Sequence, residues 1–206
     1  AAITATADKI TIGAAATYTD AAPTLIEAFP ALRAYLSRLG SRQIRNMGTI
    51  GGNIGTASPI GDMPPVLLAL EASLKLVSVR GVRDLPLEEF FLGYRKTALA
   101  PDEILVASEI PLAGTDLWFG FHELARRHGD YAIVGMAAGA RRVGDTLTQV
   151  RIALMGVDAT PQRARKTEAL LNGKVPDAAT TAGYRALVEA ARGPVEAERL
   201  AGSPWL

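Results

Sequence analysis

Cysteine is absent from this 206-residue sequence, and histidine is scarce. Without a thiol, the chain cannot form a disulfide, use a thiolate nucleophile or hold zinc or an iron–sulfur cluster through sulfur. Its two imidazoles are His122 and His128, and no group of histidines and carboxylates has metal-ligand spacing. The sequence therefore predicts no metal site, and any redox chemistry would depend on a bound cofactor.

Net charge and long apolar runs are lacking as well. There are 22 lysines and arginines against 21 aspartates and glutamates, which leaves a formal net charge of +1. This excess is too small for a general attraction to nucleic acid or acidic lipid, so any anion site must be local. No apolar run reaches the roughly 18 to 20 residues of a membrane span, and the first residues given show no basic region followed by an apolar one. We expect a soluble, cytoplasmic protein, and the start at Ala1 without methionine indicates a piece of a longer chain.

The apolar residues, 49% of the chain, indicate a globular α+β protein with two units. Residues 1–113 form the first expected unit, although residues 1–8 show no clear element. Alternation and helical spacing predict the following elements: a strand at 9–14, a helix capped by Asp20, a helix from Pro30 to Leu39, a helix after Asp62, a hairpin at 73–85 and a strand at 103–110. The dense glycines between Gly48 and Gly61 predict a stretch without regular structure.

Residues 114–206 form the second expected unit. Three strands at 118–127, 132–142 and 147–157 are predicted to form a meander. Two helices are expected to follow it, at 161–171 and 177–190.

The chemically suggestive stretch runs from Pro30 to Gly61. It begins with four arginines and no acidic residue up to Ile50, and it continues into the glycine-rich segment TIGGNIGTAS at 49–58. Glycines allow several backbone N–H groups to face one anion, so this composition is typical of a nucleotide site. A tight turn beside a solvated helix face explains the same pattern equally well. The segment is neither a Walker A loop nor a G-x-G-x-x-G fingerprint.

The segment QIRNMGTIGGNI at 43–54, continued by TASPIGD at 56–62, closely resembles the flavin-binding segment of the xanthine dehydrogenase and molybdenum hydroxylase family. Further matches follow in the same order: YRKT at 94–97, PDEIL at 101–105, EIP at 109–111 and residues 121–127. The resemblance implies the second lobe of a PCMH-type FAD-binding domain in residues 1–113. It implies a small α+β C-terminal domain, a three-stranded meander with helices, in residues 114–206.

The resemblance also implies which residues bind FAD. Backbone N–H groups of Ile50, Gly51 and Gly52, with the Thr49 hydroxyl and the Asn53 amide, would contact the diphosphate and the adjoining chain. The further implied contacts are polar ones from Thr56 and Asp62, and packing or rim positions for Leu39, Leu105 and His122. Asp62 could equally be a plain helix cap, whereas Leu39 and Leu105, taken alone, are more typical of core residues and His122 of a packed strand residue. No side chain is expected to act as a catalytic nucleophile or base.

The sequence departs from the family at His122 and in the lack of one phosphate-binding loop. His122 stands where some relatives have lysine, so a role for a fixed positive charge is in doubt, because imidazole is mostly neutral near pH 7. Residues 126–130 match the segment beside the nicotinamide pocket, but a charged turn would explain them too. The family's other phosphate-binding loop has no counterpart here, so we expect it in an N-terminal lobe upstream of Ile10 or on another chain.

The resemblance therefore implies the FAD-binding portion of a molybdenum hydroxylase, most similar to the bacterial xanthine dehydrogenases of purine metabolism. Electrons would arrive from iron–sulfur clusters, pass through FAD and reduce NAD. The clusters and the molybdopterin would lie on other domains or on partner subunits of a hetero-oligomer. The flavoprotein of a carbon monoxide or aldehyde dehydrogenase is a close alternative, and a cofactor-free docking or scaffold module is an alternative from another class.

Overall fold

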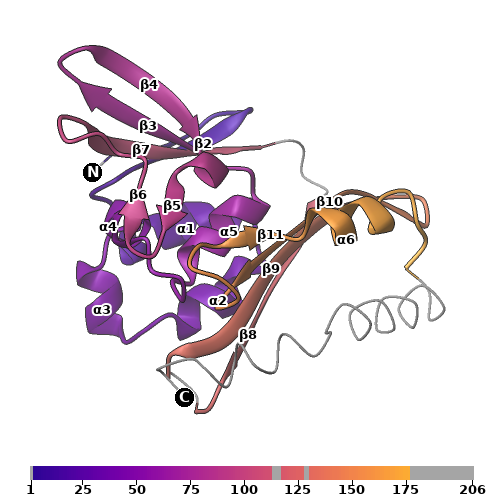
Figure 1. Cartoon of the computed structure of the whole chain (residues 1–206). Helices are drawn as coiled ribbons and strands as arrows, with labels where there is room; N and C mark the ends of the chain where they lie inside the picture. Colours follow the sequence, from indigo (N-terminus) through magenta and orange to yellow (C-terminus); the bar gives the residue numbers. More distant parts are fainter. Residues whose placement is uncertain (1, 113–116, 128–129, 177–206) are drawn as a thin grey trace.

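Two antiparallel sheets flank a group of helices in the computed structural model, which describes residues 2–112, 117–127 and 130–176 (Figure 1). The five-stranded sheet consists, in sheet order, of β1 (Ile3–Ala5), β2 (Lys9–Gly13), β7 (Ile104–Pro111), β3 (Ser73–Ser78) and β4 (Gly81–Pro86). The four-stranded sheet consists of β11 (Gln162–Arg163), β10 (Thr146–Met155), β9 (Ala132–Val143) and β8 (Leu117–Ala125). A small ribbon pairs β5 (Phe91–Gly93) with β6 (Lys96–Thr97).

The helices lie mainly between the two sheets. They are α1 (Tyr18–Ala28), α2 (Leu32–Arg38), α3 (Arg42–Met47), α4 (Ile50–Thr56), α5 (Met63–Ala69), the 3-10 turn η1 (Leu87–Glu89) and α6 (Arg165–Leu171). Helix α4 contacts β2 and β7 of the first sheet, whereas α2 contacts β8 and α5 contacts β9 and β10 of the second. The same helical layer therefore packs against both sheets.

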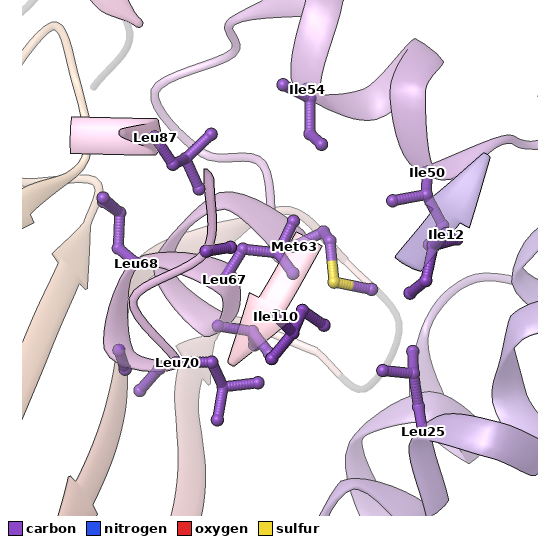
Figure 2. Close-up of a cluster of buried hydrophobic side chains, with 14 of the residues drawn as sticks. Ile12, Leu25, Ile50, Ile54, Met63, Leu67, Leu68, Leu70, Leu87 and Ile110 are labelled. Carbon is purple, nitrogen blue, oxygen red and sulfur yellow. The ribbon is translucent and has the colours of Figure 1, made fainter. Parts of the chain in front are cut away.

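One continuous core joins these layers. All seven residues of α5 are buried, and Figure 2 shows side chains from β2, α1, α4, α5, η1 and β7 meeting around it. Pro64 and Pro65 lie in the first turn of α5, where their missing N–H groups would have no partner inside the helix. Helix α5 has no solvated face because α4, η1 and the second sheet pack around it.

Apolar and polar residues alternate along the strands, so one face of the five-stranded sheet is buried and the other is hydrated. Ile10 and Ile12 point into the core with no exposed surface. On the opposite face, Lys9 pairs with Glu109 at 2.9 Å and Lys75 pairs with Asp84 at 2.8 Å. These ion pairs add little stability but keep the outer face hydrated.

Helix α1 begins earlier than the sequence suggested. Thr17, not Asp20, is its N-cap, and the Thr17 hydroxyl accepts a hydrogen bond from the Asp20 N–H at 3.1 Å. The Asp20 carboxylate accepts in return from the Thr17 backbone N–H, which completes a capping box. The hydrogen bond from the Thr17 hydroxyl lowers the pKa of Asp20. Pro23 consequently lies one turn inside the helix rather than at its start.

The expectation of no regular structure between Gly48 and Gly61 is wrong, because Ile50–Thr56 within this stretch form helix α4. The segment runs antiparallel to the loop after β2: the Ile50 N–H donates to the Ala16 carbonyl and the Gly51 N–H to the Ala14 carbonyl, each at 2.9 Å. A Cβ at Gly51 would lie 2.5 Å from the Cβ of Ala14. Glycine is therefore required at 51 for this close approach, and the helix follows from the tertiary contact rather than from helix propensity.

The second unit contains the three predicted strands, but its sheet has a fourth strand, β11, where a helix was expected to begin. Helix α6 starts only at Arg165, because residues 162 and 163 pair with β10. Residues 1–8 likewise contain strand β1, paired with β2. The strands and helices predicted at 9–14, 30–39, 73–85 and 103–110, and after Asp62, are confirmed with shifts of a few residues. The helix predicted at 177–190 lies outside the described residues.

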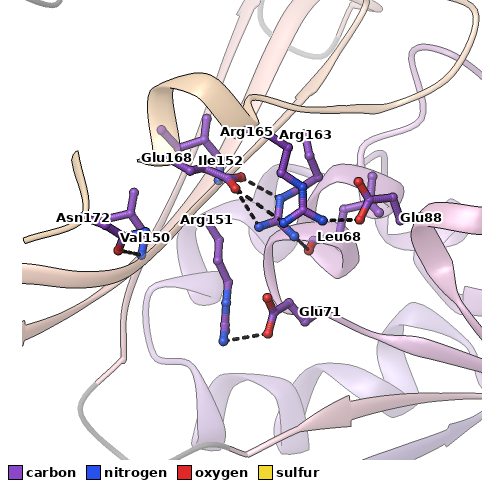
Figure 3. Close-up of polar contacts among 10 residues, drawn as sticks. All are labelled: Leu68, Glu71, Glu88, Val150, Arg151, Ile152, Arg163, Arg165, Glu168 and Asn172. Atoms are coloured by element: carbon purple, nitrogen blue, oxygen red, sulfur yellow. Dashed lines mark hydrogen bonds and ion pairs between the residues drawn. The ribbon is translucent and has the colours of Figure 1, made fainter. Parts of the chain in front are cut away.

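A buried ion pair ties the second sheet to α5 (Figure 3). Arg163 and Glu168 are 4% and 6% exposed and form two hydrogen bonds, of 2.6 and 3.0 Å. Glu168 also accepts from the Ile152 N–H, while Arg163 donates to the carbonyl of Leu68 in α5. Burial by itself would raise the pKa of Glu168, but the hydrogen bonds from Arg163 and Ile152 bring it below its ordinary value.

We predict that Glu168→Ala lowers the free energy of unfolding by about 3 to 5 kcal/mol, because it leaves the Arg163 guanidinium buried without its counter-charge. Urea denaturation checks this value. Asp145→Ala is the control, since it breaks the exposed pair with Arg142 and should cost less than about 1 kcal/mol. Equal effects of the two substitutions would contradict the role given to the buried pair.

Two glycines of α4 should respond oppositely to the same added methyl group. Gly51→Ala is expected to cost about 1 to 3 kcal/mol, because the methyl group collides with Ala14. Gly55→Ala meets nothing within 4 Å and should stabilise the protein by roughly 0.5 to 1 kcal/mol through helix propensity. Thermal or urea unfolding distinguishes the two, and a neutral Gly51→Ala would refute the close approach.

Candidate functional site

Three of the residues predicted to bind the cofactor line one cavity of about 60 Å³. Leu39 comes from the end of α2, Asp62 from the start of α5 and His122 from β8. The other lining residues are Ala34, Tyr35, Arg38, Phe121 and Glu123. Residues from three distant parts of the chain therefore meet at the boundary between the helical layer and the second sheet.

An aromatic contact holds the two sides of this cavity together. The rings of Tyr35 and Phe121 lie 4.6 Å apart, centre to centre, at an angle of 50°. Tyr35 is fixed on α2 by burial, and Phe121 projects from the inner face of β8, the face that also carries Glu123 two residues later. Glu123 lines the same cavity as Asp62.

Asp62 does not use its carboxylate as a helix cap. It occupies the N-cap position of α5, yet within the described part of the chain its side chain makes no capping hydrogen bond. Burial, and to a lesser extent the negative charge of Glu123, raises the pKa of Asp62 to about 6. The Asp62 side chain is half-buried at the wall of the cavity, and its role toward a cofactor stays a prediction.

Other buried polar atoms near Asp62 lack a protein partner too. Within the described part of the chain, the Tyr18 and Tyr35 hydroxyls and the Asn53 Oδ1 are buried and accept or donate no hydrogen bond. Asn53 Oδ1 lies beside Gly61, within 3.6 Å of where a Cβ would project. Burial is the main reason that the pKa values of both tyrosines are raised, and the charge of Asp62 adds to each. Buried polar atoms without a protein partner are uncommon, and they mark a place where ordered water or a ligand can supply the missing hydrogen bond.

The backbone donors at the start of α4 are not available in the expected way. The N–H groups of Ile50 and Gly51 donate to Ala16 and Ala14, and the Gly52 N–H donates to the Thr49 hydroxyl at 3.0 Å. In this structure all three N–H groups therefore have protein acceptors, and their contact with phosphate stays a prediction. What remains at this end of α4 is the exposed Gly52 and the proton of the Thr49 hydroxyl. Whether these residues contact the cofactor in another way stays a prediction.

Two further predicted residues lie apart from the cavity. The Thr56 hydroxyl donates to the Gly52 carbonyl at 2.8 Å and is exposed on α4. Leu105 is half-buried in β7 opposite Leu76, and it lines neither this cavity nor the groove described next. Their roles toward a cofactor remain predictions.

The four arginines of the basic stretch have different roles. Arg45 donates to the carbonyls of Leu39 and Gly40 at 3.0 and 2.7 Å, so it caps the C-terminus of α2. Arg33 and Arg42 line a second, open groove of about 670 Å³ between α1, α2 and α3, while Arg38 lines the smaller cavity. Of the four arginines, Arg45 therefore stabilises the fold through its hydrogen bonds to the end of α2.

Sequence reasoning missed Tyr35 and Glu123 as site residues. Tyr35 was assigned only to the apolar face of its helix, which is where it lies. Glu123 could have been found from its spacing, since it is two residues after Phe121 and therefore on the same face of the strand. Across the residues that the structure describes, no three acidic or histidine side chains gather as a metal site would require. None of the described helices is both long and apolar enough to cross a membrane.

Comparison with known families gives two matches in sequence. Residues 1–113 match the FAD binding domain in molybdopterin dehydrogenase, and residues 119–201 match the CO dehydrogenase flavoprotein C-terminal domain. Xanthine dehydrogenase of Oryza sativa is 40% identical over 155 residues, which cover 72% of this chain and 11% of that protein. The medium subunit of nicotine 6-hydroxylase from Paenarthrobacter nicotinovorans is 35% identical over 170 residues, covering 80% and 59%.

Solved structures agree with these matches. Carbon monoxide dehydrogenase from Hydrogenophaga pseudoflava superposes with a TM-score of 0.82 and 32% identity, covering 87% of this chain and 63% of that one. Quinoline 2-oxidoreductase from Pseudomonas putida 86 superposes with a TM-score of 0.80 and 34% identity, covering 88% and 64%. The chain spans less than two thirds of the length of these relatives. It belongs to the family of FAD-binding domains found in molybdopterin dehydrogenases.

Proposed function

We propose that this chain is the flavin-binding part of a molybdenum hydroxylase and that the cavity lined by Leu39, Asp62 and His122 receives part of FAD. The observation that carries the proposal is the convergence of these three residues, far apart in sequence, on one cavity. Beside it lies the cluster of buried polar atoms without protein partners. A fold that served only as a scaffold would gain nothing from leaving these groups unpaired.

The side chains around the cavity divide into two kinds. Leu39 and Phe121 supply apolar surface for a flat ring, and Tyr35 packs against Phe121. Asp62 offers hydrogen-bonding oxygens to hydroxyl groups. FAD, once bound, supplies the electron-transfer chemistry, while these residues bind it, orient it and exclude water.

The wider enzyme is inferred from its relatives. The matches include the medium subunit of nicotine 6-hydroxylase and the medium chain of carbon monoxide dehydrogenase from Hydrogenophaga pseudoflava. These names indicate that flavoproteins of this kind work in multi-subunit enzymes. We propose that molybdopterin and iron–sulfur partners deliver electrons to the FAD held here and that NAD accepts them. Xanthine dehydrogenases among the relatives favour a purine substrate. The similarity to carbon monoxide dehydrogenase structures favours carbon monoxide as a second candidate. In either case the substrate would be oxidised at the partner's molybdenum.

Filling the cavity should remove the flavin. We predict that Leu39→Trp weakens FAD binding by at least about tenfold, because the indole ring occupies a space of about 60 Å³ that the cofactor would use. The measurement is the ratio of flavin absorbance to protein after purification and dialysis of the flavoprotein as its gene encodes it. Circular dichroism verifies that the variant is folded.

Ile44→Trp is the matched control, since Ile44 is 57% exposed on the neighbouring helix α3 and lines neither the cavity nor the groove. It should keep the flavin content of the unaltered protein. Full flavin in Leu39→Trp, or equal loss in both variants, would contradict the placement of FAD. A protein that binds no FAD under any condition would instead favour the cofactor-free scaffold.

A further inference from the structure

The open groove of about 670 Å³ between α1, α2 and α3 has no part in the proposed flavin site. The less exposed part of its lining is mainly apolar, with Ala22 and Ile26 from α1 and Leu36 from α2. Its exposed lining includes Arg33 of α2 and Arg42 of α3. The groove therefore offers an apolar surface beside two exposed positive charges.

These two arginines have no acidic partner in the part of the chain that the structure describes. Other arginines of this protein do pair with carboxylates, even at exposed positions. Arg83, for example, pairs with Glu103 at 2.6 Å. The charges of Arg33 and Arg42 are therefore available to a binding partner.

Two more charged side chains line the groove. Arg45 adds a third positive charge while it donates to the carbonyls at the end of α2. Glu27 of α1 is exposed and takes part in no ion pair with a described residue. Three arginines against one glutamate give the lining a net charge of +2, although the whole chain carries only +1.

Charge and openness together select the kind of molecule that fits. A small anion in an open groove would keep its water and be attracted only weakly, whereas a protein segment excludes water by its own bulk. Nucleic acid binding needs many phosphate contacts, and a chain with so little net charge does not supply them. A protein segment with carboxylates for the arginines and apolar side chains for Ile26 and Ala22 complements both features of the groove.

We propose that the groove between α1, α2 and α3 is the docking site for an acidic, amphipathic segment of a partner subunit. That the partner belongs to the same enzyme rests on the proposed function, and the names of two relatives as a medium subunit and a medium chain support it. Arginine suits such a site because its planar guanidinium can bind one carboxylate through two hydrogen bonds, while its stem packs on apolar surface.

Helix α2 is the common wall of this groove and of the flavin cavity. Arg33, Leu36 and Ser37 line the groove and share one face of the helix at spacings of three and four. Tyr35 and Arg38 line the cavity and lie on the opposite face. Because a helix with its side chains is about 10 to 12 Å wide, the docked subunit would come within about that distance of the flavin without lining its cavity.

Charge reversal tests the docking site in the enzyme purified with all its subunits. The double variant Arg33→Glu, Arg42→Glu should raise the Kd of the flavoprotein for its partners at least about tenfold, because two attractions become repulsions. Both residues lie in the first turn of their helices, where glutamate is favourable, so the fold should be kept. Mass photometry over a dilution series measures the dissociated fraction. At about 1 M salt the difference from the unaltered enzyme should shrink.

The matched control is Lys166→Glu, Lys174→Glu, which changes the net charge by the same amount. Both lysines are exposed, on or just after α6, and neither pairs with an acidic residue of the described chain. Helix α6 lies on the far side of the molecule from α3 (Figure 1). This control should assemble as the unaltered enzyme does. Equal weakening in both double variants, or none in either, would overturn the docking site.

Photo-crosslinking identifies the segment that occupies the groove. A benzoylphenylalanine in place of Ser37, an exposed residue of the groove lining, should link within the assembled enzyme to a partner-subunit peptide of net negative charge. The same group in place of Lys166 should not link to that peptide. A link to a second copy of this chain, to a neutral or basic peptide, or to no protein would overturn the proposal.

The flavin content of the same preparations separates this inference from the proposed function. The arginine double variant should keep the flavin of the unaltered protein, because neither Arg33 nor Arg42 lines the cavity. Loss of flavin from an intact assembly would place an anionic part of the cofactor in the groove and overturn the docking site. An enzyme without flavin whose assembly still depends on these arginines would refute the proposed function and leave the docking site standing.

Discussion

The close approach of Gly51 to Ala14 is the constraint on which the site depends. The missing Cβ lets the segment before α4 lie against the loop after β2, with three main-chain hydrogen bonds, from Tyr18, Ile50 and Gly51, between them. This pairing fixes the first turn of α4 on the five-stranded sheet. Asn53 is on that helix, and only a short link separates it from Asp62 and α5. Gly51, which the sequence suggested as part of a phosphate-binding loop, is therefore required for close packing against Ala14.

The other wall of the site depends on α5 and the second sheet. Because α5 is buried along its whole length, it holds β9 and β10 in place, and the ion pair of Arg163 with Glu168 adds a hydrogen bond to its backbone. The ring contact between Tyr35 and Phe121 then aligns β8 with α2. The cavity is therefore built by both family-matched segments of the chain together, and neither supplies all of its residues.

Much of this arrangement was predictable, and the failures have physical causes. The hairpin of β3 and β4 and the strands β7 to β10 were predictable from alternation and turn residues, and they pair as antiparallel neighbours. Helix α4 was missed because its glycines have poor helix propensity and the tertiary contact at Gly51 overrides it. Asp20 was mistaken for the N-cap because both members of a capping box have capping side chains. Sequence similarity brought Leu39, Asp62 and His122 to attention, but only the structure shows that they share a cavity with Tyr35 and Glu123.

The central claim is that FAD lies against the cavity between α2, α5 and β8. A structure of the flavoprotein determined with its cofactor bound tests this claim most directly. We predict flavin density in contact with Leu39, with a hydroxyl or ring atom within hydrogen-bonding distance of the Asp62 carboxyl group. Flavin density in the groove between α1 and α3, or elsewhere on the protein with the cavity filled only by solvent, would contradict it.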